Sequence, residues 1–428
     1  MKIDIFLNGC VREHTLVEKL IHVIEKDDML NFTDNFKEAD YIVYITCGGV
    51  WDTVTKCLNE LYDVNRLKKD GATLIIVGCL TRMSDILKDF HDDQAIKIIQ
   101  NKDWIVPLHN YIHGMNQRNS YKTGLENRTR YMYNNNASIQ FFIEDGCSNR
   151  CTFCKTNYDN SKVESVPYDI LLSYLKKLIQ KGTRCITLSG DNSTLYGIDL
   201  YNKPMLHQLI HDLSLEDGLW KLAVLELTAR NMYPELLDEL MHSAKVRQVG
   251  MQLETASNRL LKKMGRGHNL EEYDFYITKL QEARKNIHTL LMSGFPTETQ
   301  DDLDYTIKYL KERKIVCSYI CEYRNSPYIP SNLYEQFPEK VKREHTRYLQ
   351  NALHQNNYNI FSSRVGIEEE MILIGNSKGY YIFEDGSNCR LLSKSNRFRE
   401  MNFGSLSHEK IKRYVKTTVY NGSGAYKI

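Results

Sequence analysis

The sequence predicts an α/β protein with three parts: a doubly wound parallel sheet, then an incomplete (βα)6 barrel, then a small β-barrel. Three observations support this fold class. Strand-like and helix-like runs alternate over the first hundred residues, six further strand–helix units follow, and helical periodicity stops near Val365. We expect the three domains to cover residues 1–125, 137–360 and 365–428.

The N-terminal part alternates the two patterns. Strands are expected in KIDIFLNG, ADYIVYIT, ATLIIVG and AIKIIQ, and helices in VREHTLVEKLIHVIEK and from Trp51 to about Lys69. Strands that alternate with helices form a parallel sheet, because each helix returns the chain to the same edge. Residues 104–136 are polar and irregular, and their last segment, YNNNAS, is typical of a linker.

The central strands are expected in SIQFFIEDG, RCITLSG, KLAVLELTA, VRQVGMQLE, HTLLMSGFP and CSYICEYR. Helical runs such as ILLSYLKKLIQK separate them, and six units fall short of the eight that close a full barrel. The last segments, EMILIGN, GYYIFED, CRLLSK, YVKTTVY and AYKI, are short strands with turn residues between them. That pattern favours a small barrel of the OB type.

Composition limits the class of protein. The 428 residues are 42% hydrophobic, which is enough for buried cores, and the net charge of +2 does not demand a nucleic-acid partner. No apolar run approaches the roughly 20 residues that cross a bilayer, so we expect no membrane partner and a cytoplasmic location. In that compartment the eleven cysteines stay mostly reduced, and clustered ones indicate metal binding or catalysis.

One cysteine cluster follows the first central strand, in the run GCSNRCTFC. Cys147, Cys151 and Cys154 supply three thiolates on one loop, and thiolates are the usual ligands of iron–sulfur clusters. Three ligands leave one iron of a four-iron cluster open to the amino and carboxylate groups of S-adenosylmethionine. The alternative is a zinc loop, which needs a fourth ligand, and no histidine lies in the immediate neighbourhood.

A second set of cysteines is spread over the N-terminal part. Cys10, Cys47 and Cys79 each come within a residue or two of the carboxyl end of an expected strand. Ligands of open parallel sheets bind at that edge, so we expect a second cluster there. The alternative is three buried structural thiols. We assign the remaining five cysteines to packing: Cys57, Cys185, Cys317, Cys321 and Cys389.

Candidates for the S-adenosylmethionine pocket also lie near strand ends. Phe153 can pack on the adenine or simply on the protein. Ser189, Gly190 and Asp191 end the second central strand, where a glycine lets the backbone approach a ligand or forms an ordinary turn. Gly294 lies in GFPTET, which ends the fifth strand, opens a helix with a threonine N-cap and can border the adenine pocket.

Four polar residues complete the candidate pocket. Glu226 and Thr228 point the same way by period-two alternation and can line the barrel. Arg230 and Glu254 also lie at strand ends. Each of the four can equally be a structural polar residue, since polar groups at strand ends often cap or bridge.

These residues together resemble the radical-SAM methylthiotransferases over nearly the whole chain. The contexts LNGC, YITCGG and IIVGCL resemble the family's auxiliary-cluster cysteines, and IEDGCSNRCTFC is similar to its radical-SAM motif. ITLSGDNSTLYG, LLKKMGRGHNLEEY and SGFPTETQDDLDYT also resemble family segments. The C-terminal barrel then resembles the family's TRAM domain.

The resemblance implies two 4Fe–4S clusters, one held by Cys147, Cys151 and Cys154 and one by Cys10, Cys47 and Cys79. It also implies two uses of S-adenosylmethionine: one methylates a sulfur carried on the auxiliary cluster, and the other yields an adenosyl radical that abstracts a substrate hydrogen. The substrate radical then captures the methylthio group. This chemistry implies an electron donor such as flavodoxin or ferredoxin.

Some segments depart from the family's pattern. The usual Arg-Gly and Ser-Arg-Pro after the cluster loop are Asn160-Ser161 and Ser165-Val166-Pro167 here. The family's Pro-x-Gln-Ser-Gly-Ser segment is replaced here by QLETAS at residues 252–257. The family's GFPGET segment is replaced by GFPTET. The cluster cysteines are unaffected, whereas the altered pocket segments leave the substrate open.

Two substrates fit the sequence. CTFCKTNY and the Ser-x-Pro that follows are closest to the branch that modifies threonylcarbamoyl-adenosine, which favours C2 of a modified adenosine in the tRNA anticodon loop. Residues 361–428 carry eleven basic and seven acidic residues. The candidate phosphate contacts are Lys394, Arg397, Arg399, Lys410, Lys412, Arg413 and Lys416. The alternative is that these residues form a charged face exposed to solvent. The alternative is a polypeptide side chain in a ribosomal protein or precursor peptide. A more distant alternative is a non-catalytic zinc- and RNA-binding protein.

Overall fold

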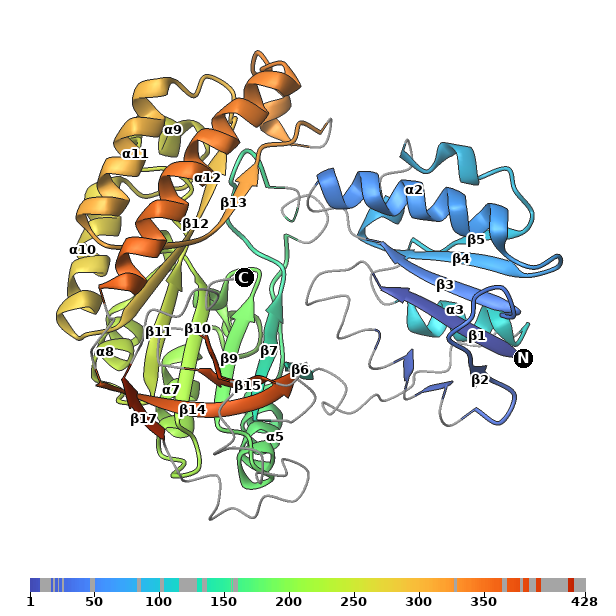
Figure 1. Ribbon diagram of the computed structural model, residues 1–428, viewed down its shortest axis with the longest axis horizontal. Helices are drawn as coiled ribbons and strands as arrows, with labels where there is room; N and C mark the ends of the chain where they lie inside the picture. Colours follow the sequence, from blue (N-terminus) through green and yellow to red (C-terminus); the bar gives the residue numbers. More distant parts are fainter. Residues whose placement is uncertain are drawn as a thin grey trace. The chain divides into compact units, whose positions relative to one another are not determined.

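The computed structural model divides into two compact units, Met1–Arg130 and Tyr131–Ile428 (Figure 1). The structure describes residues 1–7, 17, 20–21, 23–24, 27–46, 51–82, 86–100, 104–114, 129–132, 137–154, 156, 161–326, 329–363, 368–377, 380–384, 390–393 and 415–418. The three domain boundaries expected from the sequence stay a prediction.

A parallel sheet forms the centre of the first unit, with the strand order β2-β1-β3-β4-β5. The strands are β1 (Lys2–Leu7), β2 (Asn31–Phe32), β3 (Tyr41–Thr46), β4 (Thr73–Gly78) and β5 (Ile96–Ile98). Four of them match the expected strands. The fifth, β2, has two residues, which is too short to show alternation.

Helices cover both faces of this sheet, so the doubly wound fold class is confirmed (Figure 1). On one face, α2 (Trp51–Leu67) buries Val54, Cys57 and Leu61 against a core that includes Tyr44. On the other face, α3 (Ile105–Ile112) and the described helical residues between 17 and 24 pack on a separate core. Strands covered on both sides carry continuous apolar runs, which explains YIVYIT and TLIIVG.

The expectation of an irregular segment over residues 104–136 is wrong at its start. Residues 105–112 form α3, which buries Ile105, Leu108 and Ile112 in the core. Pro107 is compatible with this helix because it lies in the first turn, where its missing N–H has no intrahelical partner. Further along, β6 (Thr129–Met132) joins the edge of the second sheet.

The second unit is built on a larger sheet with the order β13-β12-β11-β10-β9-β7-β6, and β8 (Glu164–Ser165) pairs with β7. Its six parallel strands are β7 (Ser138–Asp145), β9 (Cys185–Gly190), β10 (Lys221–Leu227), β11 (Val246–Met251), β12 (Asn286–Ser293) and β13 (Val316–Glu322). All six match expected strands, which agrees with the predicted incomplete barrel.

Helices alternate with these strands and cover the outer face of the barrel (Figure 1). They are α5 (Tyr168–Gln180), α6 (Ile198–Tyr201), α7 (Leu206–Ser214), α8 (Pro234–His242), α9 (Asn258–Lys263), α10 (Leu270–Glu282), α11 (Gln300–Glu312) and α12 (Glu339–Ser362). Thr299 caps α11 through its side chain, as the sequence predicts, and Asp302 completes a capping box.

The C-terminal strands form an antiparallel sheet in the order β16-β15-β14-β17. They are β14 (Glu368–Ser377), β15 (Tyr380–Glu384), β16 (Arg390–Ser393) and β17 (Val415–Thr418). The expected strand AYKI lies outside the described residues, so closure into a barrel stays a prediction. A buried ion pair joins this sheet to the amino end of β10: Lys221 Nζ lies 2.8 Å from Glu384 Oε1.

Candidate active site

A loop with three cysteines leaves the carboxyl end of β7 and is held by hydrogen bonds from several elements. The backbone N–H of Gly146 donates to Asp191 Oδ2 (2.8 Å) at the end of β9. Thr152 donates from its N–H to the carbonyl of Met264 (2.8 Å) and from its hydroxyl to that of Lys263 (2.9 Å). Its own carbonyl accepts from the N–H of Ser331 (3.0 Å). The loop is therefore fixed by protein contacts.

The sulfur atoms on this loop accept hydrogen bonds from buried donors. Cys147 Sγ accepts from the backbone N–H of Asn149 (3.4 Å) and from Nδ2 of Asn192 (3.6 Å). Cys151 Sγ accepts from Nη1 of Arg266 (3.5 Å). Burial raises the pKa of Cys147, and these donors favour its anionic form. The arrangement suits thiolates that bind a metal, because donors near the sulfur offset the cost of burying negative charge.

Arg266 is the central cation of the site and is 5% exposed. It lies between Gly265 and Gly267, both with positive φ, and donates from Nη2 to the carbonyl of Gln252 (3.0 Å). Its Nη1 also lies 3.7 Å from Glu254 Oε1. Burial opposes the charged guanidinium, but Glu254 and the cysteine sulfurs outweigh it and raise the pKa of Arg266. The guanidinium therefore bridges a carboxylate and a sulfur.

Two carboxylates lie near this cation, Glu226 and Glu254. Glu254 bridges to β12 at Leu291, and Glu226 accepts a hydrogen bond from Gln252. Burial, with the like charges of Glu254 and Asp191, raises the pKa of Glu226 to about 7. Burial also raises the pKa of Glu254, against the pull of Arg266. Both side chains can accept hydrogen bonds from ligand hydroxyl or ammonium groups.

The alternation argument for Glu226 and Thr228 is wrong, although both side chains reach the strand-end region. The register between β10 and β11 shifts between Val224 and Leu227, and Glu226 has a φ of 61°. A β-bulge, which interrupts the two-residue alternation of side chains along the strand, therefore sets the position of Glu226. The hydroxyl of Thr228 donates to Asn231 Oδ1 (2.8 Å) and is within 3.2 Å of Asn192 Oδ1.

At Gly190 the backbone lies close to a carboxyl group of the protein. A Cβ at this position would lie 2.0 Å from Oε1 of Glu144. That carboxyl accepts from the backbone N–H of Asn192 (2.6 Å), and its Oε2 is buried without a hydrogen-bond partner. Burial, together with Asp191, raises the pKa of Glu144 well above its usual range. Gly190 therefore makes room for a buried carboxyl group.

The other predicted pocket residues have protein partners in the structure. Ser189 accepts from Gln140 Nε2 (3.1 Å), and Phe153 packs beside an apolar cluster that contains Met264 and Phe295. A Cβ at Gly294, where φ is 71°, would lie 2.9 Å from the Cβ of Lys342 on α12. That glycine serves helix packing, so its expected place beside an adenine stays a prediction. The exposed Arg230 packs its side chain on Gly267.

Sequence reasoning missed four residues that define the site: Glu144, Asn149, Asn192 and Arg266. Two signals were available. Arg266 stands between two glycines in MGRGHN, and Asn192 directly follows SGD. A glycine on each side permits the positive φ values that turn an arginine inward. Glu144 gave no signal, because an acidic residue near a strand end is normally exposed.

The N-terminal cysteines can be followed only in part, since Cys10 and Cys47 lie outside the described residues. The strands that precede them, β1 and β3, are neighbours, and β4 is the next strand. Cys79 is half-buried and directly follows β4. Thr46 Oγ1 donates to the carbonyl of Val77 (2.7 Å) and accepts from the N–H of Leu80 (3.1 Å). This pair of bonds fixes the turn that carries Cys79.

Two family models match the chain on either side of residues 99–141. Residues 2–98 match "Uncharacterized protein family UPF0004", and residues 142–310 match "Radical SAM superfamily". The second match contains the three-cysteine loop, Arg266 and Glu254.

Curated relatives match across both parts. The ribosomal protein uS12 methylthiotransferase RimO of Clostridium perfringens is 26% identical over 397 residues, which cover 89% of this chain and 88% of the relative. The protein of the same name from Lachnoclostridium phytofermentans is 28% identical over 354 residues, 80% of each chain. The chain belongs to the radical-SAM methylthiotransferase family.

As a radical-SAM methylthiotransferase, the chain is an enzyme whose cofactors are S-adenosylmethionine and 4Fe–4S clusters, and the family carries two clusters. The zinc- and RNA-binding alternative is therefore wrong. None of the helices described in the structure combines the length and apolarity of a bilayer-crossing segment.

Solved structures share the fold. The radical S-adenosylmethionine methyltransferase TsrM from Kitasatospora setae matches with a TM-score of 0.57 at 11% identity, over 78% of this chain and 75% of TsrM. The cobalamin-dependent S-adenosylmethionine radical enzyme OxsB matches with a TM-score of 0.51 at 12% identity, over 98% of this chain and 64% of OxsB. At these identities the likeness describes the fold alone.

Proposed function

We propose that this methylthiotransferase modifies a polypeptide side chain, with a ribosomal protein of the uS12 type as substrate. The observation that carries the proposal is the match to uS12 methylthiotransferases over almost 90% of both chains. This reverses the order of the two substrates expected from the sequence. The tRNA reading depended on a short motif and on a set of basic residues. Those from Lys394 to Arg413 lie outside the described residues, and the side chain of Lys416 is not described.

We assign the radical cluster to Cys147, Cys151 and Cys154, and the auxiliary cluster to Cys10, Cys47 and Cys79. When bound, the radical cluster supplies the electron that cleaves the sulfonium of S-adenosylmethionine and releases the adenosyl radical. The protein's own residues prepare the site for this step. Arg266 and Asn192 donate to the ligand sulfurs, which stabilises negative charge there.

The carboxylates complete the proposed binding site for S-adenosylmethionine. Glu226 and Glu254 are placed to accept hydrogen bonds from its hydroxyl or ammonium groups, while Arg266 keeps Glu254 from being a lone buried charge. Both carboxylates have positive φ, so the backbone stores strain to direct them into the site. Electrons would come from a small donor such as flavodoxin or ferredoxin.

The assignment of the clusters is tested by iron and sulfide analysis after anaerobic reconstitution. Two clusters hold about eight irons, and a Cys147/Cys151/Cys154 triple-alanine variant should hold about four. About four irons in the wild type and none in the variant would mean that the N-terminal cysteines hold no cluster. Cys57→Ala, a buried cysteine of α2, is the matched control and should retain all the iron.

The reaction is tested with uS12 and with tRNA that carries threonylcarbamoyl-adenosine but no methylthio group as competing substrates, each analysed by mass spectrometry for replacement of a hydrogen by a methylthio group. We expect transfer to uS12 only. Cys147→Ala should abolish cleavage of S-adenosylmethionine, whereas Cys47→Ala and Cys79→Ala should retain cleavage and lose transfer. Transfer to tRNA with uS12 unmodified would overturn the substrate. Transfer by Cys47→Ala and Cys79→Ala would overturn the second cluster.

A further inference from the structure

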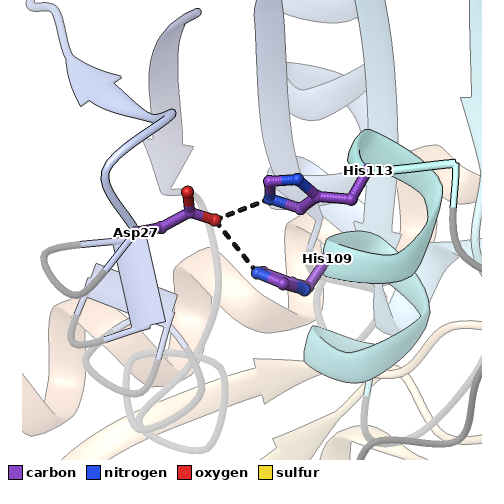
Figure 2. Close-up of side chains that lie close together, drawn as sticks. All are labelled: Asp27, His109 and His113. Atoms are coloured by element: carbon purple, nitrogen blue, oxygen red, sulfur yellow. Dashed lines mark hydrogen bonds and ion pairs between the residues drawn. The ribbon is translucent and has the colours of Figure 1, made fainter.

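Three potential metal ligands, Asp27, His109 and His113, meet in the first unit (Figure 2). Asp27 lies in the turn that precedes β2, at the amino end of the parallel strands. His109 lies in α3 and His113 is its C-cap residue. Because α3 follows the last strand and runs back across the sheet, its carboxyl end lies at the same amino edge.

The donor atoms converge on one point. Nε2 of His109 lies 3.1 Å, and Nε2 of His113 lies 2.6 Å, from the same oxygen of Asp27, Oδ2. All three donor atoms lie within 4.8 Å of one another. Figure 2 shows the two rings directed from one helix face toward this carboxylate. Histidines four residues apart lie on the same face of a helix, which is the spacing that zinc-binding helices use.

The groups are held in place by their surroundings. Oδ1 of Asp27 accepts from the backbone N–H of Met29 (2.9 Å), which leaves Oδ2 for the histidines. The turn is closed by a bond from the N–H of Leu30 to the carbonyl of Asp27 (3.1 Å). Such an outer hydrogen bond to a ligand carboxylate is a regular feature of protein metal sites.

The cluster is also largely removed from solvent. The side chains of Asp27, His109 and His113 are 11%, 9% and 8% exposed. Core residues on both sides fix the backbone: Leu108 and Ile112 hold α3, and Leu30 holds the turn.

We propose that Asp27, His109 and His113 bind one divalent transition-metal ion of the zinc class, which fastens α3 to the turn before β2. Two imidazoles and a carboxylate are ligands that zinc accepts, and three protein ligands leave a further position for water. Ligands bound at about 2.0–2.1 Å lie about 3.3 Å apart in a tetrahedral site. To reach that separation, the distance to Oδ2 opens by about 0.2 Å from His109 and by about 0.7 Å from His113. The inference is independent of the proposed substrate.

A hydrogen-bond clasp without an ion is the competing explanation, and Asp27→Asn separates the two. An asparagine retains an oxygen that can accept from a histidine, but it loses the charge that a metal ligand supplies. If hydrogen bonds alone join these residues, the contact between α3 and the turn therefore survives Asp27→Asn in part. A zinc site should lose more than about tenfold in affinity, which is the least that loss of an outer-shell partner costs.

The experiment measures zinc and iron separately by plasma mass spectrometry on the full chain with reconstituted clusters, after dialysis against micromolar free zinc. The wild type should hold one zinc per chain in addition to its iron. His113→Ala and Asp27→Asn should lose that zinc and retain the iron. His242→Ala is the matched control, since this histidine pairs with Asp238 at 3.0 Å on the surface, and it should retain the zinc.

Thermal melting with and without zinc gives a second measurement. Zinc should raise the melting temperature of the wild type and of His242→Ala, and should leave those of Asp27→Asn and His113→Ala unchanged, because an ion stabilises only a fold that binds it. Equal zinc content in wild type and both variants, or no zinc in the wild type, would overturn the proposal. A variant that unfolds would also lose its iron and its circular dichroism signal. In that case His109→Gln is measured in its place.

Discussion

The guanidinium of Arg266 donates to the sulfur of Cys151 across 3.5 Å, and both side chains are buried. A fixed positive charge beside a metal-binding sulfur stabilises whichever state of the metal centre carries more negative charge. An iron–sulfur cluster carries more negative charge when it is reduced, so this contact affects how easily the enzyme accepts an electron.

Replacing Arg266 should therefore lower the reduction potential of the radical cluster. Arg266→Met removes a charged hydrogen bond worth about 1.5–3 kcal/mol, which corresponds to roughly a ten- to hundred-fold loss in the equilibrium constant for reducing the cluster, or about 60–120 mV. Arg266→Lys keeps the charge and should recover part of that loss. Potentiometric titration followed by electron paramagnetic resonance measures the shift. An unchanged potential with full iron content would contradict this role.

Stability should depend on pH through Glu226. Its pKa is raised from 4.5 to about 7 in the folded protein, so the folded state holds a proton that the unfolded state has released. The free energy of unfolding should therefore fall as the pH rises from about 5 to 7, by at most roughly 3 kcal/mol. Thermal melts of the ligand-free protein across that range measure the loss. Glu226→Gln should flatten this part of the profile, and an equally steep profile in the variant would assign the dependence to other groups.

Gly190→Ala should destabilise the second unit. The new Cβ would lie 2.0 Å from Glu144 Oε1, and overpacking of this kind costs about 1–3 kcal/mol. Urea unfolding of the single variant, of Glu144→Ala and of the double variant measures the coupling. Because Glu144→Ala removes the atom that clashes, Gly190→Ala should cost much less in that background. Additive effects would show that the glycine is required for a different reason.

The ion pair between Lys221 and Glu384 gives a further stability prediction. The two side chains are 1% and 3% exposed, so Lys221→Met leaves a buried carboxylate without its cation, at a cost of about 3–5 kcal/mol. Replacing both residues with apolar ones should recover most of the loss, since no charge is then buried alone. Arg66→Ala removes an exposed pair with Asp63 and should leave the unfolding midpoint unchanged. A similar loss in the single and double variants would contradict this account.

The elements that the sequence predicts well are those whose burial is uniform along the strand. YIVYIT and TLIIVG lie under helices on both faces, so their apolar runs identify them directly. The first turns of α3 were missed because IVPLHNYI is followed by a long polar stretch and contains a proline. The core that buries Leu108 is formed by strands distant in the sequence, and a local pattern carries no record of them.

Beyond the cysteines, the sequence named Glu226 and Glu254 as candidates but not the groups that hold the site together. Cysteine spacing is a local property, whereas Arg266 enters the site only because two glycines turn the backbone there. The bulge that places Glu226 breaks the alternation on which its prediction rested. Gly190 was expected to let a ligand approach the backbone, which stays a prediction, whereas the neighbour that the structure shows, Glu144, comes from the adjacent strand β7. Tertiary partners of this kind are invisible in one sequence.

The hydrogen bonds of Thr46 affect how a cluster would bind at Cys79. They join the end of β3 to the turn of Cys79 through protein atoms alone, so this thiol is in position before any iron arrives. Little chain entropy then has to be lost at Cys79 when a cluster is captured. The auxiliary cluster that we propose at Cys79 therefore binds at a strand end whose backbone is already fixed by its neighbour β3.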